Sequence, residues 1–259
     1  MFAAVTVLAG GLVAVEVYVL SPGMRAGSVG VLERAGAWDR LAGMLDDDDP
    51  DVRAAASDAL LRNGPAAIPA LTRGLDRLPD RGRAFAAFTL GRIGPNARAA
   101  LPALRRHMTE DAAAEVREAA AVAAGRVGRD DAAAVNEFLR MLEAGSTVER
   151  LAAARAAPEL ADSDRRRAVP LLAALLAHPD AEARKEAVEA LGAIGADARP
   201  AVPVLIQATT DPVREVRAEA AEALEHLLLS PGGLDPDTVA RVTAALAGAR
   251  AGPPPAGRP

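Results

Sequence analysis

The stretch EARKEAVEALGAIGADARPAVPVLIQA, residues 182–208, decides the fold of this chain. In its first half, the residues 3, 7 and 10 positions after Arg184 are Ala187, Leu191 and Ile194. With Arg184 they share one face of an α-helix. Its second half contains Pro203, which a helix tolerates in its first turn. The stretch therefore predicts two helices joined by a short link.

The arginine of this stretch recurs along the chain at spacings of 30 to 34 residues. The members of this column are Arg53, Arg83, Arg117, Arg150, Arg184 and Arg217. Alanine stands three residues after each of them, at Ala56, Ala86, Ala120, Ala153, Ala187 and Ala220. The repeated offsets predict six amphipathic helices, at about residues 51–63, 80–93, 112–127, 147–160, 181–194 and 213–229.

Glycine and proline indicate where these helices end. Eleven residues after the arginine, four of the six units have glycine, at Gly64, Gly94, Gly128 and Gly195. Glycine in that place predicts a left-handed helix end, where a Cβ would be strained. In the fourth unit Pro158 predicts a shorter or bent helix over residues 150–159.

A second helix in each unit is indicated by an aliphatic residue, proline, any residue and leucine. The motif reads IPAL at 68–71, LPAL at 101–104, VPLL at 169–172 and VPVL at 202–205, while the third unit has VNEF at 135–138. We expect each proline in the first turn, because deeper in a helix it would cause a kink. Aspartate in the links should cap the backbone amides of the next helix.

These columns and motifs resemble the HEAT-repeat family, in its short bacterial form often called PBS-lyase-like. The resemblance covers about residues 28–249 and is closest over residues 179–207. It implies an all-α fold, an α-solenoid or superhelix of about six HEAT-like helical hairpins, in which stacked neighbours share one continuous core. It also implies that the arginine-bearing helices line the concave face, and that the arginines form a ladder with link acids such as Asp180 and Asp211.

The two ends of the chain differ from the repeats. Residues 1–20 are apolar with one charge, Glu16, and their length matches the bilayer core, so they predict a membrane anchor. The arginines that follow would leave the solenoid cytoplasmic. The alternatives are an apolar element packed on its neighbour, a misassigned start in a soluble cytoplasmic protein, or a signal for export. Residues 21–27 are expected to form a linker, residues 31–45 an opening helix around Trp38, and residues 250–259 a proline-rich disordered tail.

The composition and the motifs of the sequence argue against catalysis and against nucleic-acid binding. A net charge of −5 is unlike that of a dedicated nucleic-acid binder, so no nucleic acid is expected. The sequence has no cysteine and no histidine pair with metal-ligand spacing, and no catalytic serine or phosphate-loop motif occurs. We therefore predict a protein that is not an enzyme and needs no cofactor.

The surface of the arginine-bearing helices is where partner contacts are expected. Offsets 2 and 5 from each arginine lie off the apolar stripe and should point outward. They give apolar candidates in the second and third units, Phe85, Phe88 and Val122, and acidic candidates in the fifth and sixth, Glu186, Glu189, Glu219 and Glu222. The competing interpretation is that the phenylalanines fill space beside small alanines and that the glutamates are simply solvated.

The functional prediction is a non-enzymatic scaffold that binds an unknown protein partner on the concave face. Repeat arrays present extended surfaces of this kind. Because phycobilin lyases share this repeat, the alternatives are a tetrapyrrole or phycobilin lyase-like protein or a chaperone of an enzyme complex. A repeat domain separated from a larger sensor or kinase chain is the remaining alternative.

Overall fold

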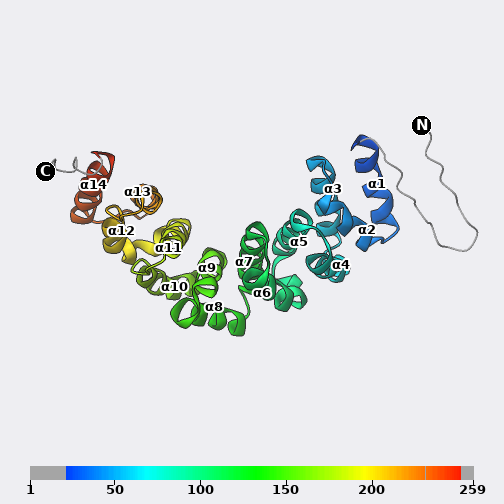
Figure 1. The fold of residues 1–259 in the computed structure, drawn as a ribbon, viewed down its shortest axis with the longest axis horizontal. Coiled ribbons are helices and arrows are strands. Elements are labelled where there is room, and N and C mark those ends of the chain that lie inside the picture. Colours follow the sequence, from blue (N-terminus) through cyan, green and yellow to red (C-terminus); the bar gives the residue numbers. More distant parts are fainter. Residues whose placement is uncertain (1–21, 231, 252–259) are drawn as a thin grey trace, which may run out of the picture.

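The computed structural model describes residues 22–230 and 232–251 of the chain. Over those residues the secondary structure is α-helix with short 3-10 segments, and no strand occurs among them. The helices follow one another as stacked hairpins that form a curved array (Figure 1). The prediction of an all-α solenoid is confirmed.

Each hairpin consists of one helix on the inner side of the curve and one on the outer side. The opening hairpin is α1 (Pro22–Arg34) with α2 (Trp38–Gly43) and η1 (Met44–Asp46). The arginine-bearing helices are α3 (Pro50–Arg62), α5 (Asp80–Ile93), α7 (Ala114–Gly128), α9 (Thr147–Ala156, continued by η3, Ala157–Glu159), α11 (Ala181–Ile194) and α13 (Arg214–Leu229). Their hairpin partners are α4 (Gly64–Arg77), α6 (Leu101–Glu110, preceded by η2, Gly94–Ala100), α8 (Ala132–Ala144), α10 (Asp162–Leu175), α12 (Val202–Ala208, preceded by η4, Gly195–Ala201) and α14 (Pro236–Ala251).

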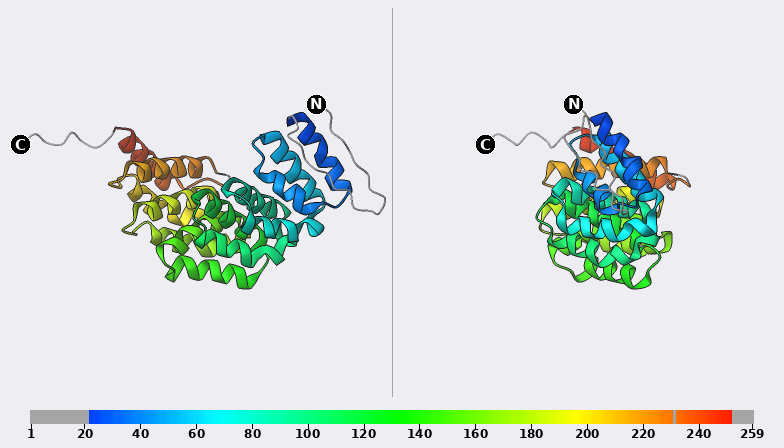
Figure 2. Two further views of the ribbon diagram at one scale, coloured as in Figure 1. Left: turned by 45° about the vertical axis from the view of Figure 1, so that its right-hand side comes forward. Right: turned by 90° about the vertical axis from the view of Figure 1, so that its right-hand side faces the viewer.

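The arginine-bearing helices line the concave side of the array. In Figure 1, α3, α5, α7, α9, α11 and α13 lie along the inside of the curve, and α4, α6, α8, α10 and α12 lie along the outside. Seen nearly end-on, the hairpins overlap in a narrow profile (Figure 2). The array is therefore one hairpin wide and offers a long inner surface.

Small residues allow the inner helices to pack closely. All six members of the alanine column are fully buried, with 0% exposure. At one seam Gly125 of α7 lies so close to α9 that an added Cβ would be 2.6 Å from the carbonyl oxygen of Ala156. Larger side chains behind the column, including Leu60, Leu90 and Leu191, complete the core. The core is continuous along the array because each hairpin buries its apolar face on its neighbours.

The arginine column fixes the link between successive hairpins. Each of its six arginines donates a hydrogen bond to a backbone carbonyl at the end of the preceding hairpin. For Arg217 the acceptors are the carbonyls of Asp211 and Pro212, at 2.7 and 3.0 Å. These carbonyls lie beyond the last helical turn and lack a helical partner, so the arginine satisfies them. The column is thus structural in each unit.

The glycines at repeat offset eleven are not equivalent. Gly94 and Gly195 end α5 and α11 with φ of 68°, which only glycine adopts readily, although ψ of −143° and −131° lies outside the left-handed helical region. Gly64 and Gly128 have no positive φ, because Gly64 begins α4 directly and Gly128 is the last helical residue of α7. The prediction of a left-handed end in all four units is therefore wrong.

The prolines of the second helices also divide into two groups. Pro102 and Pro203 lie in the first turns of α6 and α12, as the motif predicts. Pro69 and Pro170 lie inside α4 and α10, since these helices begin earlier than the motif indicates, at Gly64 and Asp162. Where a 3-10 segment precedes the second helix, the proline begins the α-helix.

The fourth unit departs from the repeat as its proline predicts. α9 has 10 residues, whereas the other arginine-bearing helices have 13 to 16. It changes to the 3-10 segment η3, which includes Pro158. The prediction of a shorter helix in this unit is confirmed.

The N-terminal part of the array corrects two expectations. Residues 22–27, expected as linker, belong to α1. The single opening helix expected over 31–45 is two helices, because the chain reverses at Gly36, whose φ is 64°. Trp38 begins the second of these helices and packs against the core.

The expectation of a membrane-anchored chain with a cytoplasmic solenoid is also corrected. Within residues 22–230 and 232–251, no helix is long and apolar enough to cross a bilayer. The apolar segment 1–20 that carried the expectation lies outside the described residues, as do most residues of the predicted tail. Membrane attachment has no part in the function proposed below.

Candidate functional site

An aromatic cluster joins α3 and α5, two helices of the concave side. The rings of Phe85 and Phe88 meet edge to face, with centroids 6.4 Å apart. The guanidinium of Arg53 lies 5.1 Å from the centre of the Phe85 ring, and that of Arg92 lies 5.8 Å from the Phe88 ring. Such contacts hold aromatic rings in place by attraction between the cation and the ring face. We call Arg53, Phe85, Phe88 and Arg92 the aromatic cluster.

The two phenylalanines are not equally available to a partner. Phe85 is half-buried and packs against the core, as the space-filling interpretation requires. Phe88 is 46% exposed, so almost half of its surface is open to solvent. Arg92 is held beside it by an ion pair with Asp58 at 2.8 Å. Phe88 is therefore an exposed aromatic side chain with a cation beside its ring.

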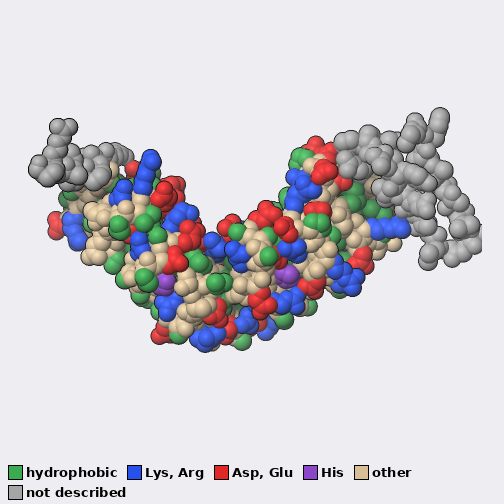
Figure 3. All heavy atoms as spheres, viewed as in Figure 1, with side chains coloured by type: hydrophobic (Ala, Val, Ile, Leu, Met, Phe, Trp, Pro, Cys, Tyr) green, Lys and Arg blue, Asp and Glu red, His purple; other side chains and the backbone are tan. Residues whose placement is uncertain are grey.

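The middle of the concave face is built from smaller residues. Val122 of α7, the third apolar candidate, is half-buried. Val148 at the start of α9 is 46% exposed. Acidic and basic side chains are interspersed along the hollowed side of the molecule (Figure 3). The face is therefore amphipathic along its length.

An acidic groove lies between α11 and α13. It is a cavity of about 230 Å³ lined by Val188, Glu189, Gly192, Ala193, Glu219, Glu222, Ala223 and His226. Lys185 pairs with Glu189 at 2.9 Å, and His226 lies 4.0 Å from Glu222. Burial raises the pKa of Glu219, and the neighbouring Glu189 and Glu222 raise it further. Three glutamates thus share a groove whose floor is made of small residues.

Glu186 is not the free surface glutamate that its repeat offset predicts. It is 7% exposed and forms an ion pair with Arg155 of α9 at 2.7 Å. Ala152, at the same offset in the fourth unit, is also buried. At this seam the inner helices lie close enough to cover the residues at offset 2. The structure therefore groups Glu189, Glu219 and Glu222 and separates Glu186 from them.

Two members of the arginine column are also ion-paired across hairpins. Arg83 binds Asp111 with Nε and Nη2 at 2.9 and 2.8 Å, and Arg184 binds Asp211 at 2.8 and 2.9 Å. The other acid expected in a ladder, Asp180, instead caps α11 by accepting from the amide of Glu182. The remaining arginines of the column bind carbonyls in the links.

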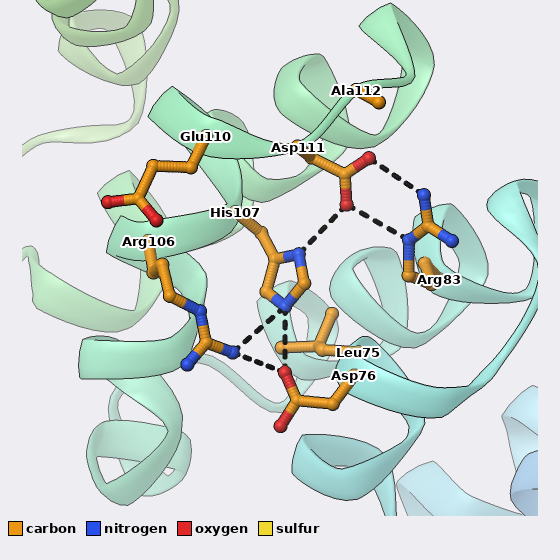
Figure 4. Close-up of a pocket in the computed structure, with 8 residues that line it drawn as sticks. All are labelled: Leu75, Asp76, Arg83, Arg106, His107, Glu110, Asp111 and Ala112. Atoms are coloured by element: carbon orange, nitrogen blue, oxygen red, sulfur yellow. Dashed lines mark hydrogen bonds and ion pairs between the residues drawn. The ribbon is translucent and has the colours of Figure 1, made fainter.

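The cavity drawn in Figure 4, about 350 Å³, lies where the ion pair of Arg83 and Asp111 meets α4 and α6. His107 is held there between two carboxylates, with Nδ1 at 2.8 Å from Asp111 and Nε2 at 3.0 Å from Asp76. Arg106 also binds Asp76. Burial, which would raise the pKa of Asp111, is outweighed by its hydrogen bonds from Arg83, His107 and the Ala113 amide, and the pKa falls to about 2.

These polar groups are already paired with one another, so the cavity is a structural junction between hairpins. Sequence reasoning missed the junction, although the i, i+4 spacing of His107 and Asp111 was visible on the predicted helix. Over the residues that the structure describes, no three His, Asp or Glu side chains are arranged to hold a metal ion.

Stacked hairpins with an arginine at every link define the class of the protein as an α-solenoid. Within that class, residues 135–225 match the family model described as HEAT repeats. The recognition of these repeats in the sequence is confirmed. A comparison with curated protein sequences finds no match.

Solved structures of similar fold include YibA of Escherichia coli, at 21% identity over 89% of this chain and 88% of that chain, with a TM-score of 0.52. Kap121p in complex with Pho4p is similar at 18% identity over 88% of this chain and 28% of that chain, with a TM-score of 0.57. The CpcE–CpcF complex of phycocyanin lyase from Nostoc is 23% identical over 88% of this chain and 90% of that chain, with a TM-score of 0.47. At these identities the similarity to YibA and Kap121p shows the fold and not the activity.

Proposed function

We propose that this chain is a non-enzymatic scaffold that binds a protein partner along its concave face. The observation that carries the proposal is the exposed ring of Phe88, which contacts Phe85 and Arg92 on an inner helix of the array. Aromatic side chains placed this way are over-represented among the residues that dominate protein interfaces. A ring that only filled space would be more buried than Phe88 is, as the half-buried Phe85 shows.

The charges of the face indicate what kind of segment would bind. The aromatic cluster lies on α3 and α5, and the acidic groove lies on α11 and α13, which follow several units further along the row of inner helices (Figure 1). The occupant that fits both is an extended segment with an apolar residue for Phe88 and a lysine or arginine for the groove. A long basic side chain can place its apolar stem on Gly192 and Ala223 and its charge among the glutamates.

The fold supports this use in a general way. The solved structure of Kap121p, whose fold is similar, contains a second protein, Pho4p. Repeat arrays present long curved surfaces because their inner helices are aligned side by side.

The test uses a displayed peptide library selected on the purified chain. Peptides selected on the wild type should combine an apolar residue with a basic one. Their affinity should fall at least about thirtyfold for Phe88→Ala, since truncating a residue that dominates an interface costs about 2 kcal/mol or more. The double variant Glu219→Gln, Glu222→Gln should weaken only the peptides that carry the basic residue.

The matched control is Leu229→Ala, which removes an apolar side chain that is 84% exposed at the end of α13. It should leave peptide affinity unchanged. Unchanged affinity for Phe88→Ala, with helicity retained, would remove the aromatic cluster from the site.

A further inference from the structure

One ion pair between inner helices differs from the others, because its acid is buried with a single charged partner. Arg155 of α9 contacts Glu186 of α11 through Nε at 2.7 Å and faces Glu118 of α7 through Nη2 at 3.5 Å. The side chain of Arg155 is 15% exposed and that of Glu186 is 9% exposed, whereas that of Glu118 is 55% exposed. Arg155 therefore bridges three successive inner helices, and its closer contact is with the buried carboxylate of Glu186.

The seam that this pair crosses is built from small contacts. α9 is the shortest of the arginine-bearing helices and stops ahead of Pro158. Four of its buried residues are alanines, at positions 152, 153, 154 and 156. Alanine buries little apolar area, so this helix gains less from packing than its longer neighbours do. The position of α9 against α11 thus depends more on the state of its polar contacts.

The buried acids at other seams are far better satisfied. Asp111 accepts two hydrogen bonds from Arg83, one from His107 and one from the amide of Ala113. Glu186 has one arginine contact. A buried charge with a single partner costs more in lost hydration than the partner returns. Burial accordingly raises the pKa of Glu186 to about 7 despite the attraction of Arg155.

The charges around Glu186 work in the same direction. On its own helix Glu182 and Glu189 add negative charge and raise its pKa further. On α13, Glu219 interacts with Glu189, and Lys185 of α11 is paired with Glu189 at 2.9 Å. Among the largest influences on the pKa of Glu186, Arg155 is the base and Glu182 and Glu189 are the acids.

Solvent reaches this seam through a cavity of about 340 Å³. Its lining includes Arg117, Glu118, Leu151, Arg155 and Glu182, from α7, α9 and α11. A carboxylate that moves toward this cavity would regain hydration.

We propose that the α9–α11 seam is a proton-linked hinge, closed while Glu186 is neutral and loosened when Glu186 is ionised. The direction is opposite to that of an ordinary salt bridge, because hydration lost on burial outweighs the contact with Arg155. Since the folded seam holds the proton more tightly than an opened one, acid favours closing and alkali favours opening. The hinge lies between the aromatic cluster and the acidic groove. Its effect on partner binding rests on the proposed function, but the hinge itself does not.

The experiment measures hydrogen exchange of the α9 amides, Thr147–Ala156, in the full chain without any partner. Protection factors, corrected for intrinsic exchange, are compared at about pH 5 and about pH 8. Between the ordinary value of the glutamate pKa and about 7, the closing equilibrium can change on the order of 10²-fold. Protection of α9 should therefore be higher at the lower pH by up to that factor.

Two variants and a control make the result specific. Glu186→Gln keeps the size of the side chain and an oxygen that accepts from Arg155, and it should abolish the pH dependence. Arg155→Met removes the counter-charge and should move the transition to higher pH. Glu222→Gln, at an exposed glutamate of α13, should retain the wild-type response.

Equal protection of wild-type α9 at both pH values, or an unchanged response in Glu186→Gln, would overturn the hinge. Because no partner is present, either result leaves the proposed scaffold function standing. Loss of peptide binding in the earlier test would equally leave the hinge intact.

Discussion

Arg184 on α11 and Asp211 ahead of α13 are joined by two nearly parallel hydrogen bonds, of 2.8 and 2.9 Å. The backbone carbonyl of the same aspartate accepts a third bond from Arg217, at 2.7 Å. One link residue therefore couples two successive members of the arginine column. Both side chains of the pair are largely buried, at 12% and 9% exposure. The hairpins are thus joined by shared polar contacts as well as by apolar packing.

The first prediction concerns the strength of this coupling. Asp211→Ala removes the partner of a largely buried guanidinium, so the free energy of unfolding should fall by about 3 kcal/mol. Urea unfolding followed by circular dichroism measures the loss. The matched control is Asp39→Ala, which breaks an exposed ion pair with Arg73 between hairpins and should cost less than about 1 kcal/mol. Equal losses in the two variants would show that the link aspartate is not special.

The second prediction concerns stability in acid. The pKa of Asp111 is lowered to about 2 in the folded chain, so its contribution is present above the ordinary aspartate value and is lost as the pH falls toward 2. The lost contribution is about 2 kcal/mol. Unfolding measured from neutral pH downward should show this loss in the wild type.

The variant Asp111→Asn should lack that part of the acid dependence, while Asp130→Asn, at an exposed aspartate, should keep it.

Glu186 changes the free energy of unfolding in the opposite direction, and it does so over a higher range of pH. Its stabilising effect is present below the ordinary glutamate pKa and is lost as the pH rises through about 7. Between about pH 4 and pH 2, where Glu186 is already protonated, a wild type that lost no more stability than Asp111→Asn would contradict the role assigned to Asp111.

The repeat could be predicted from sequence because its signals are local. The burial of Ala187 and Leu191 follows from helical spacing alone. Six copies of that spacing predict that the hairpins stack on one another. The burial of Glu186 could not be read from the same spacing. It depends on how closely α9 approaches α11, which Pro158 and the small residues of that seam decide.

The aromatic cluster was only partly visible in the sequence. Helical spacing placed Phe85 and Phe88 on one side of α5, but the guanidinium groups that hold the two rings come from two different helices. Arg92 lies on α5 itself, whereas Arg53 belongs to the preceding unit. Contacts between units depend on the lateral shift of one helix against the next, which the periodicity of either helix leaves open.

The last prediction separates two glycines at the same repeat offset. Gly94 has φ of 68° and ψ of −143°, a conformation that alanine does not readily adopt, although an added Cβ would meet nothing within 4 Å. Gly94→Ala should therefore destabilise the chain by about 1–3 kcal/mol through backbone strain alone. Gly64 begins α4 without a positive φ, and its added Cβ would also meet nothing within 4 Å.

Gly64→Ala should accordingly be neutral or stabilise the chain by up to about 1 kcal/mol, because alanine restricts the unfolded chain and suits a helix. Urea midpoints of the two variants, measured beside the wild type, give the comparison. The two substitutions add the same methyl group at equivalent positions in neighbouring units, so any difference in sign reports the backbone conformation. Destabilisation by Gly64→Ala as large as that by Gly94→Ala would mean that the two helix ends share one conformation in solution.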